Sequence, residues 1–250
     1  MVTGSHNPKN YNGFKIVLDR SSLIEKEILL LKKRIENDNF LTGKGKLSNQ
    51  SFDQKYIEEL NEKIILGKKL KVVLDCGNGA GSVLGPTIFK KFSDELIELF
   101  CKVDGSFPNH HPDPSDPKNL SDLIKAVELH KADVGIALDG DGDRLGIVDS
   151  DGEIIYPDRY LSLMSKDILE KYKESKIVFD VKCSNQLKRT IEKHKGIPIM
   201  TKTGHSFIKS EIKKNNAILG GEMSGHIFYN EDWYGFDDGI FSGLKLLEIL

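Results

Sequence analysis

The apolar positions of this chain follow two periods that alternate along most of its length. Short runs enriched in Val and Ile are typical of buried β-strands, whereas apolar residues recurring every three or four positions are typical of helices. The strand pattern occurs at residues 14–18, 71–75, 96–100, 133–138, 145–149, 176–180, 197–201 and 217–220. Because helical patterns lie between these runs, we predict an α/β fold.

Three helical stripes predict core-facing positions. Their members are Ile24, Ile28, Leu31 and Ile35, then Leu120, Leu123 and Val127, and then Leu161, Met164, Ile168 and Tyr172. A further amphipathic helix is expected within residues 237–250. We expect the apolar faces of these helices to pack on the strands.

Two segments are typical of connectors. Residues 42–51 are rich in glycine and small polar residues, and residues 150–152 (Ser-Asp-Gly) form a predicted hairpin turn between two strands. The final helix pattern has no stop signal and an unusual polar motif begins by residue 3, so we expect further residues before Met1 and after Leu250. The predicted domains are residues 1–50, 51–152 and 153–250.

Composition narrows the class of protein and its partners. Lys and Arg total 36 and Asp and Glu total 38, and this net charge of −2 disfavours nucleic acid or an anionic membrane as partner. Apolar runs are far shorter than the roughly 20 residues of a membrane-spanning helix. The three cysteines form no C-x-x-C pair and the first residues show no signal-peptide pattern, so we expect a reduced, cytoplasmic protein.

The strongest chemical signal follows the strand predicted at 133–138. Asp139, Asp141 and Asp143 alternate with glycines, which allow a tight turn, so the three carboxylates can converge on one hard cation. The carboxyl end of a strand is also where α/β folds place ligands. The alternative is an acidic surface turn, but three crowded carboxylates without a cation would repel one another.

The identity of the cation follows from the spacing. An EF-hand needs glycine at the sixth loop position and glutamate at the twelfth, where this chain has Arg144 and Ser150, so a calcium-signalling loop is disfavoured. Mg²⁺ fits better, because it commonly takes a few carboxylates and completes its shell with phosphate oxygens. Arg144 could then hold a phosphate or position Asp143.

A second candidate site lies near the N-terminus, in Thr3-Gly-Ser-His-Asn-Pro8. Ser5 offers a hydroxyl nucleophile, His6 an adjacent imidazole, and Lys15 an ammonium group that could return beside them. Taken alone, this motif is also typical of a simple turn. The sequence alone does not place Ser5 near Asp139.

A third candidate site is the glycine-rich segment at 220–226. Glu222, Ser224 and His226 offer donors and acceptors suited to sugar hydroxyls, although a hairpin with its polar residues in water fits equally well. His205 follows the strand predicted at 197–201 and is a candidate acid/base or phosphate contact.

Another glycine-rich segment, at residues 75–81, does not complete the G-x-G-x-x-G pattern of dinucleotide-binding loops, and we interpret it as a tight turn between a strand and a helix. His110 and His111 lie among three prolines, which favours a stiff structural connector over a metal site.

Taken together, the motifs T-G-S-H-N-P, D-G-D-G-D-R and G-E-M-S-G-H closely resemble those of the α-D-phosphohexomutase family, in particular its bacterial phosphomannomutase/phosphoglucomutase branch. They occur in the family's order, and the resemblance extends over essentially the whole chain. It implies consecutive α/β domains with mixed, largely parallel sheets sandwiched by helices, as part of a four-domain protein. Residues 1–50 would be the C-terminal part of domain 1, 51–152 domain 2 and 153–250 domain 3, with domain 4 absent.

The resemblance implies an isomerase that interconverts hexose 1-phosphate and hexose 6-phosphate, of mannose, glucose or both. Ser5 would be phosphorylated, and Asp139, Asp141 and Asp143 would bind one Mg²⁺ together with that phosphoserine. A hexose 1,6-bisphosphate would be the intermediate and activator. Hexose phosphates are the expected partners of a monomeric enzyme.

Further site residues are assigned through the same resemblance. Catalytic roles fall to Ser5, His6, Lys15, Arg144, His205 and His226, and substrate contacts to Lys182, Gly204, His205, Glu222, Ser224 and His226. Glu222 and Ser224 match residues that bind sugar hydroxyls away from C2, which would explain tolerance for both glucose and mannose.

Two alternatives remain. One is a phosphatase of the haloacid dehalogenase-like class, with Asp139 as nucleophile and Asp237-Asp238 as its late acidic pair, although Asp143 stands where that class prefers Thr or Val. The other is a non-catalytic fragment that binds sugar phosphates. We expect the 250-residue chain by itself to have little mutase turnover.

Overall fold

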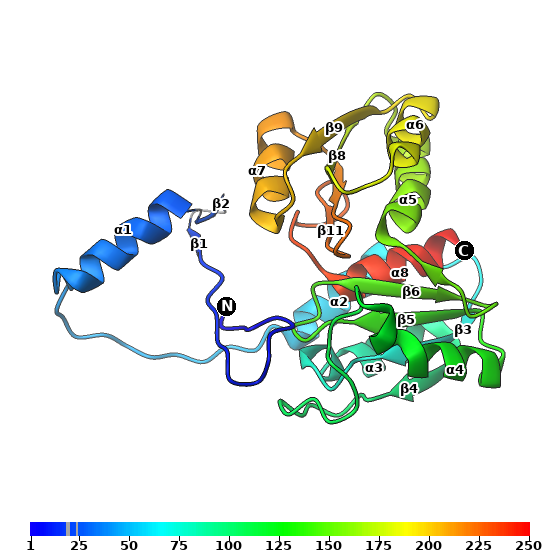
Figure 1. Cartoon of the computed structure of the whole chain (residues 1–250), viewed down its shortest axis with the longest axis horizontal. Coiled ribbons are helices and arrows are strands. Elements are labelled where there is room, and N and C mark those ends of the chain that lie inside the picture. Colours follow the sequence, from blue (N-terminus) through cyan, green and yellow to red (C-terminus); the bar gives the residue numbers. More distant parts are fainter. Residues whose placement is uncertain (19–20, 24) are drawn as a thin grey trace.

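The computed structural model describes residues 1–18, 21–23 and 25–250, which form two mixed β-sheets and a small N-terminal ribbon (Figure 1). The first sheet has the order β4-β3-β5-β6-β7, formed by Ser93–Leu99, Leu70–Asp75, Val134–Leu138, Leu145–Asp149 and Ile154–Ile155. The second has the order β11-β10-β8-β9, formed by Ile227–Tyr229, Leu219–Gly221, Lys176–Asp180 and Ile197–Thr201. The ribbon pairs β1 (Val17–Leu18) with β2 (Ser21–Ser22).

Both sheets contain parallel strands at their centre and antiparallel strands toward one edge. β3 is parallel to β4 and β5, and β8 is parallel to β9 and β10. β6 and β7 join the first sheet antiparallel, as β11 joins the second. The parallel pairs need helical crossovers, which accounts for the alternating pattern of the sequence.

Helices cover both faces of each sheet, so the predicted α/β architecture is confirmed. The helices are α1 (Glu25–Glu36), α2 (Asp53–Lys63), α3 (Gly85–Phe92), α4 (Ser121–His130), α5 (Pro157–Lys171), α6 (Asn185–Lys193), α7 (His205–Asn215) and α8 (Gly239–Ile249). α4 covers one face of the first sheet, and α3 and α8 cover the other. In the second sheet, α7 packs on one face and α5 and α6 on the other.

One hydrophobic core is continuous between the two sheets. Phe89 of α3, Leu161 of α5 and Leu244 of α8 belong to the same buried cluster, together with strand residues of both sheets. The helix predicted at the end of the chain is therefore confirmed, but it is not amphipathic: Ser242 and Lys245 are buried along with its apolar residues. α8 is enclosed because it lies between the first sheet and α5.

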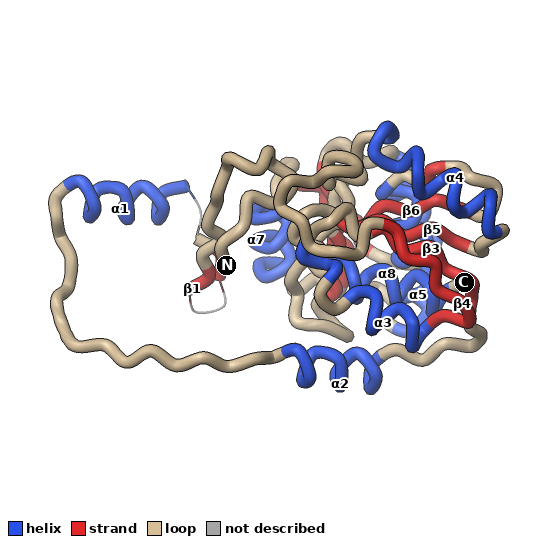
Figure 2. The backbone as a smooth tube through the Cα atoms, turned by 90° about the horizontal axis from the view of Figure 1, so that it is seen from below, coloured by secondary structure: helices blue, strands red, loops and turns tan. Residues whose placement is uncertain are grey.

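The predicted stripes of α4 and α5 face the core as expected, but the stripe of α1 does not. Ile28 is 51% exposed and Ile35 is 63% exposed, while Ile24 lies outside the described residues. α1 lies away from both sheets, and a long extended segment leads from it to α2 (Figures 1 and 2). Its apolar side chains therefore pack on neither sheet.

Strand boundaries differ from the predictions where strands are short. The strand predicted at 14–18 is reduced to β1, with an isolated bridge between Phe14 and Val2. β7 is the second strand that the hairpin turn predicted at 150–152 requires, whereas β11 was not predicted, because three residues are too few to show a period. The predicted turn at 150–152 does connect an antiparallel pair, β6 and β7.

The segment at 75–81 makes the tight turn predicted from its glycines. Gly77 and Asn78 have φ of 50° and 59°, a left-handed conformation that the turn requires. His110 Nε2 lies 3.0 Å from Asp75 Oδ2, so this histidine braces the turn. Among the residues described, no helix is long and apolar enough to cross a membrane.

Asp238 is a buried N-cap whose ionisation predicts a pH-dependent stability. It accepts a hydrogen bond from the backbone N–H of Phe241 at 2.9 Å and from the Tyr56 hydroxyl at 2.9 Å, and burial raises its pKa to about 6. A carboxyl with a raised pKa contributes stability that is complete below about pH 4 and lost as the pH rises through about 6.

We therefore expect Asp238→Asn to become more stable relative to the parent chain as the pH rises from 4 to 7, by up to about 2–3 kcal/mol. Denaturant unfolding at each pH measures this difference. Asp116→Asn, at an exposed cap that accepts from Lys118 N at 3.0 Å, is the matched control. Equal pH profiles for the two variants would contradict the expectation.

Candidate functional site

The acidic loop is shaped by the hydrogen bonds of its first carboxylate. The chain leaves β5 at Leu138, and Asp139 Oδ1 then accepts the backbone N–H groups of Asp143 at 3.0 Å and Arg144 at 3.2 Å. Gly142, with φ of 77°, makes the turn that returns the chain into β6. The loop is therefore wound around the buried Asp139 side chain.

The three carboxylates converge as the sequence predicted. Asp139, Asp141 and Asp143 each offer an oxygen within 4.8 Å of the others. One oxygen of Asp141 and one of Asp143 are buried without a hydrogen-bond partner among the described residues. Burial and the two neighbouring carboxylates raise the pKa of Asp139 to about 8. Crowded, unsatisfied carboxylate oxygens of this kind fit a hard divalent cation such as Mg²⁺.

Lys15 supplies positive charge to the same cluster. Its Nζ lies 2.8 Å from Asp141 Oδ2 and also pairs with Asp143. Burial alone would lower the pKa of Lys15, but these two carboxylates outweigh it and raise that pKa. The same pairing holds the pKa of Asp141 down against the effect of burial.

The serine loop meets the acidic loop directly. Ser5 Oγ donates to Asp139 Oδ2 at 3.1 Å, across 134 positions of sequence, and lies 3.0 Å from His6 Nδ1. Ser5 has φ of 52°, and its backbone N–H donates to Thr3 Oγ1 at 2.8 Å. Thr3 in turn donates to Asp141 Oδ2 at 3.0 Å. The hydroxyl, the imidazole and the carboxylates are therefore brought together.

This approach requires glycine at position 140. A Cβ there would lie 2.2 Å from the carbonyl oxygen of Ser5, a distance that backbone atoms cannot accommodate without moving. On the other side, Ala80 N donates to Gly140 O at 2.9 Å. The acidic loop is thus held between the serine loop and the turn at 75–81.

Arg144 joins the acidic loop to the second sheet. Its Nε donates to His226 Nε2 at 3.1 Å, and Arg144 and His226 form an isolated antiparallel bridge. Its guanidinium lies 3.6 Å from Asp113 and 3.7 Å from Asp139. Burial and the charge of Arg144 lower the pKa of His6, which favours the neutral imidazole that can accept a proton.

His226 is held by a second pair of carboxylates. Its Nδ1 lies 3.0 Å from Asp237 Oδ2 and 3.3 Å from Asp143 Oδ1, and Asp237 also pairs with Lys209. Burial alone would lower the pKa of His226, but the hydrogen bond with Asp237 and the charge of Asp143 raise it. The mutase interpretation of the sequence missed Asp237 and Lys209, and only the acidic pair at 237–238 gave a signal.

The glycine-rich segment at 220–226 turns its polar residues toward the same region. Glu222 is buried, accepts the backbone N–H of Gly204, and accepts from Ser224 Oγ at 3.3 Å. Burial raises the pKa of Glu222 and lowers that of His205 to about 4. The rings of His205 and His226 lie 5.8 Å apart, and His205 Nδ1 has no partner among the described residues.

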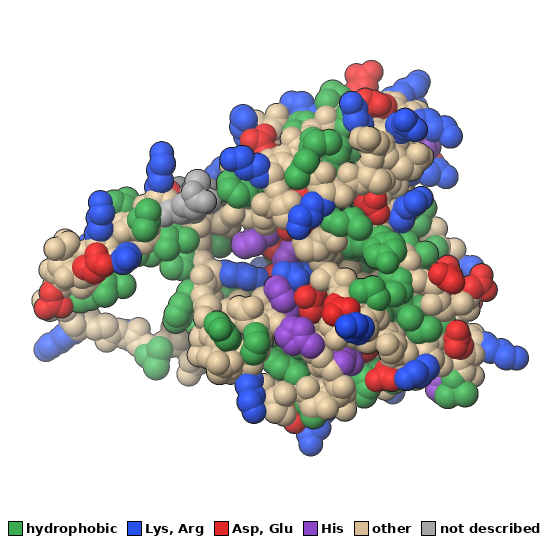
Figure 3. All heavy atoms as spheres, viewed as in Figure 1, with side chains coloured by type: hydrophobic (Ala, Val, Ile, Leu, Met, Phe, Trp, Pro, Cys, Tyr) green, Lys and Arg blue, Asp and Glu red, His purple; other side chains and the backbone are tan. Residues whose placement is uncertain are grey.

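Lys182 is the predicted site residue that the structure leaves apart. It lies in the turn after β8, is exposed, and makes no hydrogen bond or ion pair with the described residues. The other predicted side chains lie together between the part of the molecule built on the first sheet and the part built on the second. Figure 3 shows histidine and basic groups lining a hollow there.

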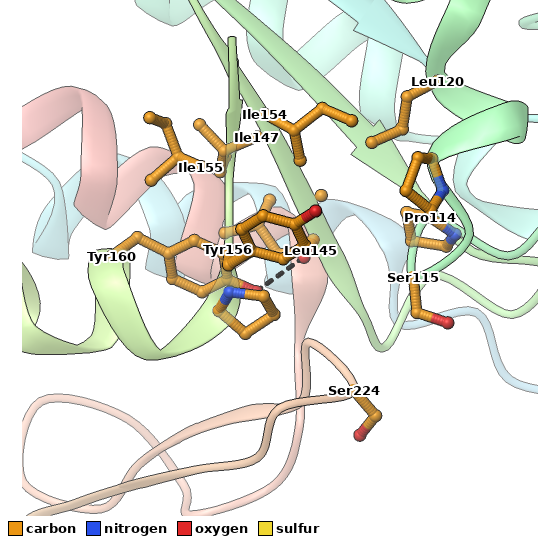
Figure 4. A pocket seen from close by; sticks show the side chains of 13 residues that line it. Pro114, Ser115, Leu120, Leu145, Ile147, Ile154, Ile155, Tyr156, Tyr160 and Ser224 are labelled. Atoms are coloured by element: carbon orange, nitrogen blue, oxygen red, sulfur yellow. Dashed lines mark hydrogen bonds between the residues drawn. The ribbon is translucent and has the colours of Figure 1, made fainter. Parts of the chain in front are cut away.

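A narrow pocket lies at the same junction. Leu145, Ile155 and Tyr156 line it, with Ser224 at one end (Figure 4). Tyr160 donates its hydroxyl to Leu145 O at 2.7 Å, and Leu145 N donates to Gly225 O at 3.0 Å. Because the residues that line it are mostly apolar, we interpret this pocket as a gap in the packing between the two sheets and not as a phosphate-binding site.

Comparison with known proteins identifies the family. Residues 54–152 match the model of phosphoglucomutase/phosphomannomutase alpha/beta/alpha domain II, and residues 156–250 match that of domain III. The chain belongs to the phosphoglucomutase/phosphomannomutase family. The family predicted from the three motifs is thereby confirmed.

Several members of this family are similar over the whole chain. A phosphomannomutase/phosphoglucomutase of Pseudomonas syringae is 50% identical over 250 residues, covering 100% of this chain and 54% of its own length. A phosphoglucomutase of Neisseria meningitidis is 48% identical over 252 residues, covering 100% of this chain and 55% of its own length. The chain therefore spans about half the length of these curated relatives.

Solved structures agree with this assignment. The structure of a phosphoglucomutase/phosphomannomutase family protein from Burkholderia thailandensis has a TM-score of 0.97 and 47% sequence identity, covering 99% of this chain and 54% of that one. A putative phosphomannomutase from Thermus thermophilus has a TM-score of 0.85 at 25% identity, covering 100% of this chain and 58% of that one.

The acidic cluster predicts a stabilisation by Mg²⁺. An ion bound only by the native state should raise the thermal midpoint of unfolding by about 5–10 °C at roughly 100 times its dissociation constant. Asp141→Asn should lose most of this shift, because it removes one ligand. Differential scanning calorimetry with and without Mg²⁺ measures it.

The matched control is Asp122→Asn, which removes an exposed carboxylate of α4 that pairs with Lys125 at 3.1 Å. It should keep the full shift. A shift of the same size in Asp141→Asn, or none in the parent chain, would exclude the acidic loop as the binding site.

Proposed function

We propose that this chain carries the phosphoserine and metal centre of a phosphohexomutase, an isomerase that interconverts hexose 1-phosphates and hexose 6-phosphates. The observation that carries the proposal is the contact of Ser5 Oγ with Asp139 Oδ2 at 3.1 Å, beside His6. A hydroxyl next to a cluster of carboxylates that can bind Mg²⁺ is suited to accept and donate a phosphoryl group. The names of the relatives support the same activity.

Each residue near Ser5 has a role in this transfer. The Ser5 hydroxyl turns its proton from Asp139 Oδ2 to His6 Nδ1, 3.0 Å away, and His6 takes this proton as the serine oxygen attacks phosphorus and the bond to the sugar oxygen breaks. Lys15 and Arg144 neutralise the charge of the phosphoryl oxygens. Asp139, Asp141 and Asp143, with phosphoserine, would hold one Mg²⁺, which when bound would stabilise the same negative charge as a Lewis acid.

The remaining residues bind the sugar and move its proton. Glu222 and Ser224 would pair with sugar hydroxyls other than that at C2, which accounts for use of mannose, glucose or both. His205 and His226 would serve as acid, base or phosphate contacts. Gly204 would lie beside the sugar, where its backbone N–H holds the Glu222 carboxylate, and Lys182, although exposed, would contact a bound phosphate.

The reaction would proceed in two transfers. Phosphoserine donates its phosphoryl group to a hexose monophosphate, forming a hexose 1,6-bisphosphate, which turns over and returns its other phosphoryl group to Ser5. Since both transfers use the same serine, the bisphosphate is both intermediate and activator. We propose a monomeric, cytoplasmic enzyme whose partners are hexose phosphates, with neither nucleic acid nor membrane.

Because the chain spans about half of its relatives' length, we separate the transfer of a phosphoryl group to Ser5 from complete turnover. We expect the 250-residue chain to accept a phosphoryl group on Ser5 but to interconvert hexose phosphates slowly. Turnover near that of a full-length relative, in a coupled assay for glucose 6-phosphate, would contradict the second expectation.

The transfer from the bisphosphate to Ser5 is tested by incubating the chain with Mg²⁺ and glucose 1,6-bisphosphate and mapping phosphate by mass spectrometry. We expect a phosphoryl group on Ser5, none on Ser5→Ala, and an unchanged yield on Ser106→Ala, whose exposed hydroxyl contacts only Asp104 among the described residues. A hydroxylamine-sensitive phosphate on Asp139 would support the phosphatase alternative. No phosphate, with hexose phosphate binding seen by calorimetry, would support a binding fragment.

A second variant tests the contact between the loops. Gly140→Ala places a Cβ 2.2 Å from Ser5 O, so the serine loop must move away from the carboxylates. We expect the rate of Ser5 phosphorylation to fall at least tenfold, roughly 1.4 kcal/mol in the transfer barrier, while the far-ultraviolet circular dichroism is unchanged.

Gly105→Ala is the matched control, because a Cβ at this exposed position meets nothing within 4 Å. It should phosphorylate at the parent rate. A Gly140→Ala rate equal to that of Gly105→Ala would show that the close approach of the two loops does not matter for transfer.

A further inference from the structure

Two of the three cysteines face each other at the carboxyl ends of neighbouring parallel strands. Cys76 directly follows β3 and Cys101 lies just beyond β4, and their Sγ atoms are 3.2 Å apart. Neither thiol belongs to the site proposed above. The third cysteine, Cys183, is buried near the end of β8 and donates instead to Asp180 at 3.2 Å.

The backbone holds both cysteines in this arrangement. Cys76 N donates to Leu99 O at 3.1 Å, and Asn78 N donates to Phe100 O at 2.8 Å. Phe100 has φ of 51°, a left-handed conformation that bends the chain at the end of β4 and returns the next side chain toward Cys76. A disulfide S–S bond is about 2.05 Å long, so the sulfur atoms need to approach by only about 1 Å.

The two thiols differ in access. Cys76 is fully buried, and its hydrogen bond with Cys101, together with burial, raises the pKa of its thiol. Cys101 is partly exposed, and its thiol donates a hydrogen bond to Leu99 O at 3.3 Å. A small oxidant therefore reaches Cys101 before Cys76, and the Cys76 thiol is already within reach of an oxidised Cys101.

We propose that Cys76 and Cys101 are a redox-modification site, which a peroxide converts to a disulfide and a dithiol reverses. The Cys101 sulfur attacks the peroxide, so that an S–O bond forms, the O–O bond breaks and one water leaves. Cys76 sulfur then attacks the sulfenic sulfur, the S–S bond forms, and the hydroxyl leaves with the thiol proton as a second water. Two thiols are oxidised and one peroxide is reduced.

A disulfide between Cys76 and Cys101 would lie next to the turn at 75–81, which contacts the acidic loop. The turn that follows Cys76 supports the acidic loop, since Ala80 N donates to Gly140 O at 2.9 Å and a Cβ at Gly79 would lie 2.6 Å from the same oxygen. A disulfide would tie the start of this turn to the segment after β4. Transient disulfides in otherwise reduced proteins are usually catalytic or redox-sensing.

The test treats the native, reduced chain with a small excess of hydrogen peroxide, blocks the remaining thiols with N-ethylmaleimide in denaturant, and maps the peptides by mass spectrometry. We expect one adduct, on Cys183, and a linked peptide pair containing Cys76 and Cys101, lighter by about 2 Da than the two reduced peptides. Dithiothreitol should restore three adducts.

Two variants and oxidation in denaturant test whether the link joins Cys76 to Cys101 and whether it needs the native fold. Cys183→Ser should form the same link, and Cys101→Ser should form none. Chain oxidised in urea should give a mixture of pairings, because only the native fold selects Cys101 for Cys76. Three adducts on folded chain after peroxide, a link to Cys183, or sulfinic acid on Cys101 without a link would overturn the proposal. None of these readouts depends on the proposed mutase activity.

Discussion

The site depends on the negative charge that three aspartates concentrate at the end of β5. Asp139 is buried beside Asp141 and Asp143, and burial, together with the charges of these two carboxylates, raises its pKa to about 8. Basic side chains compensate this negative charge: Lys15 pairs with Asp141 and Asp143, and Arg144 lies near Asp139. Positive charge, whether from these side chains or from Mg²⁺, is therefore a condition for ionising the loop.

The same requirement for charge compensation connects distant parts of the chain. Lys15 and Ser5 reach the acidic loop from the N-terminal segment, which otherwise lies apart from the two sheets. Gly140 lets that segment approach until backbone touches backbone. The Ser5 hydroxyl and the carboxylate cluster are thus brought together by contacts among a few side chains, so small displacements of either loop would separate them.

The parts of this site that the sequence predicted are those encoded locally. Carboxylates at alternate positions after a strand must share one loop, so the Asp139–Asp143 cluster was predictable, as were the strands around it. The contact of Ser5 with Asp139 spans 134 positions and depends on tertiary packing. For α1, the period of the apolar residues predicts the helix correctly but predicts their burial wrongly. Whether Ile28 is buried depends on what lies beside the helix, which the local sequence does not specify.

Asp237 shows how the fold, rather than a motif, completes the site. Asp238 is extended, with φ of −143°, so neighbouring side chains point to opposite sides: Asp238 caps α8, and Asp237 faces His226 at 3.0 Å. α8 is enclosed between the first sheet and α5, and its start fixes the position of the acidic pair. The core shared by the two sheets therefore sets the distance between His226 and the acidic loop.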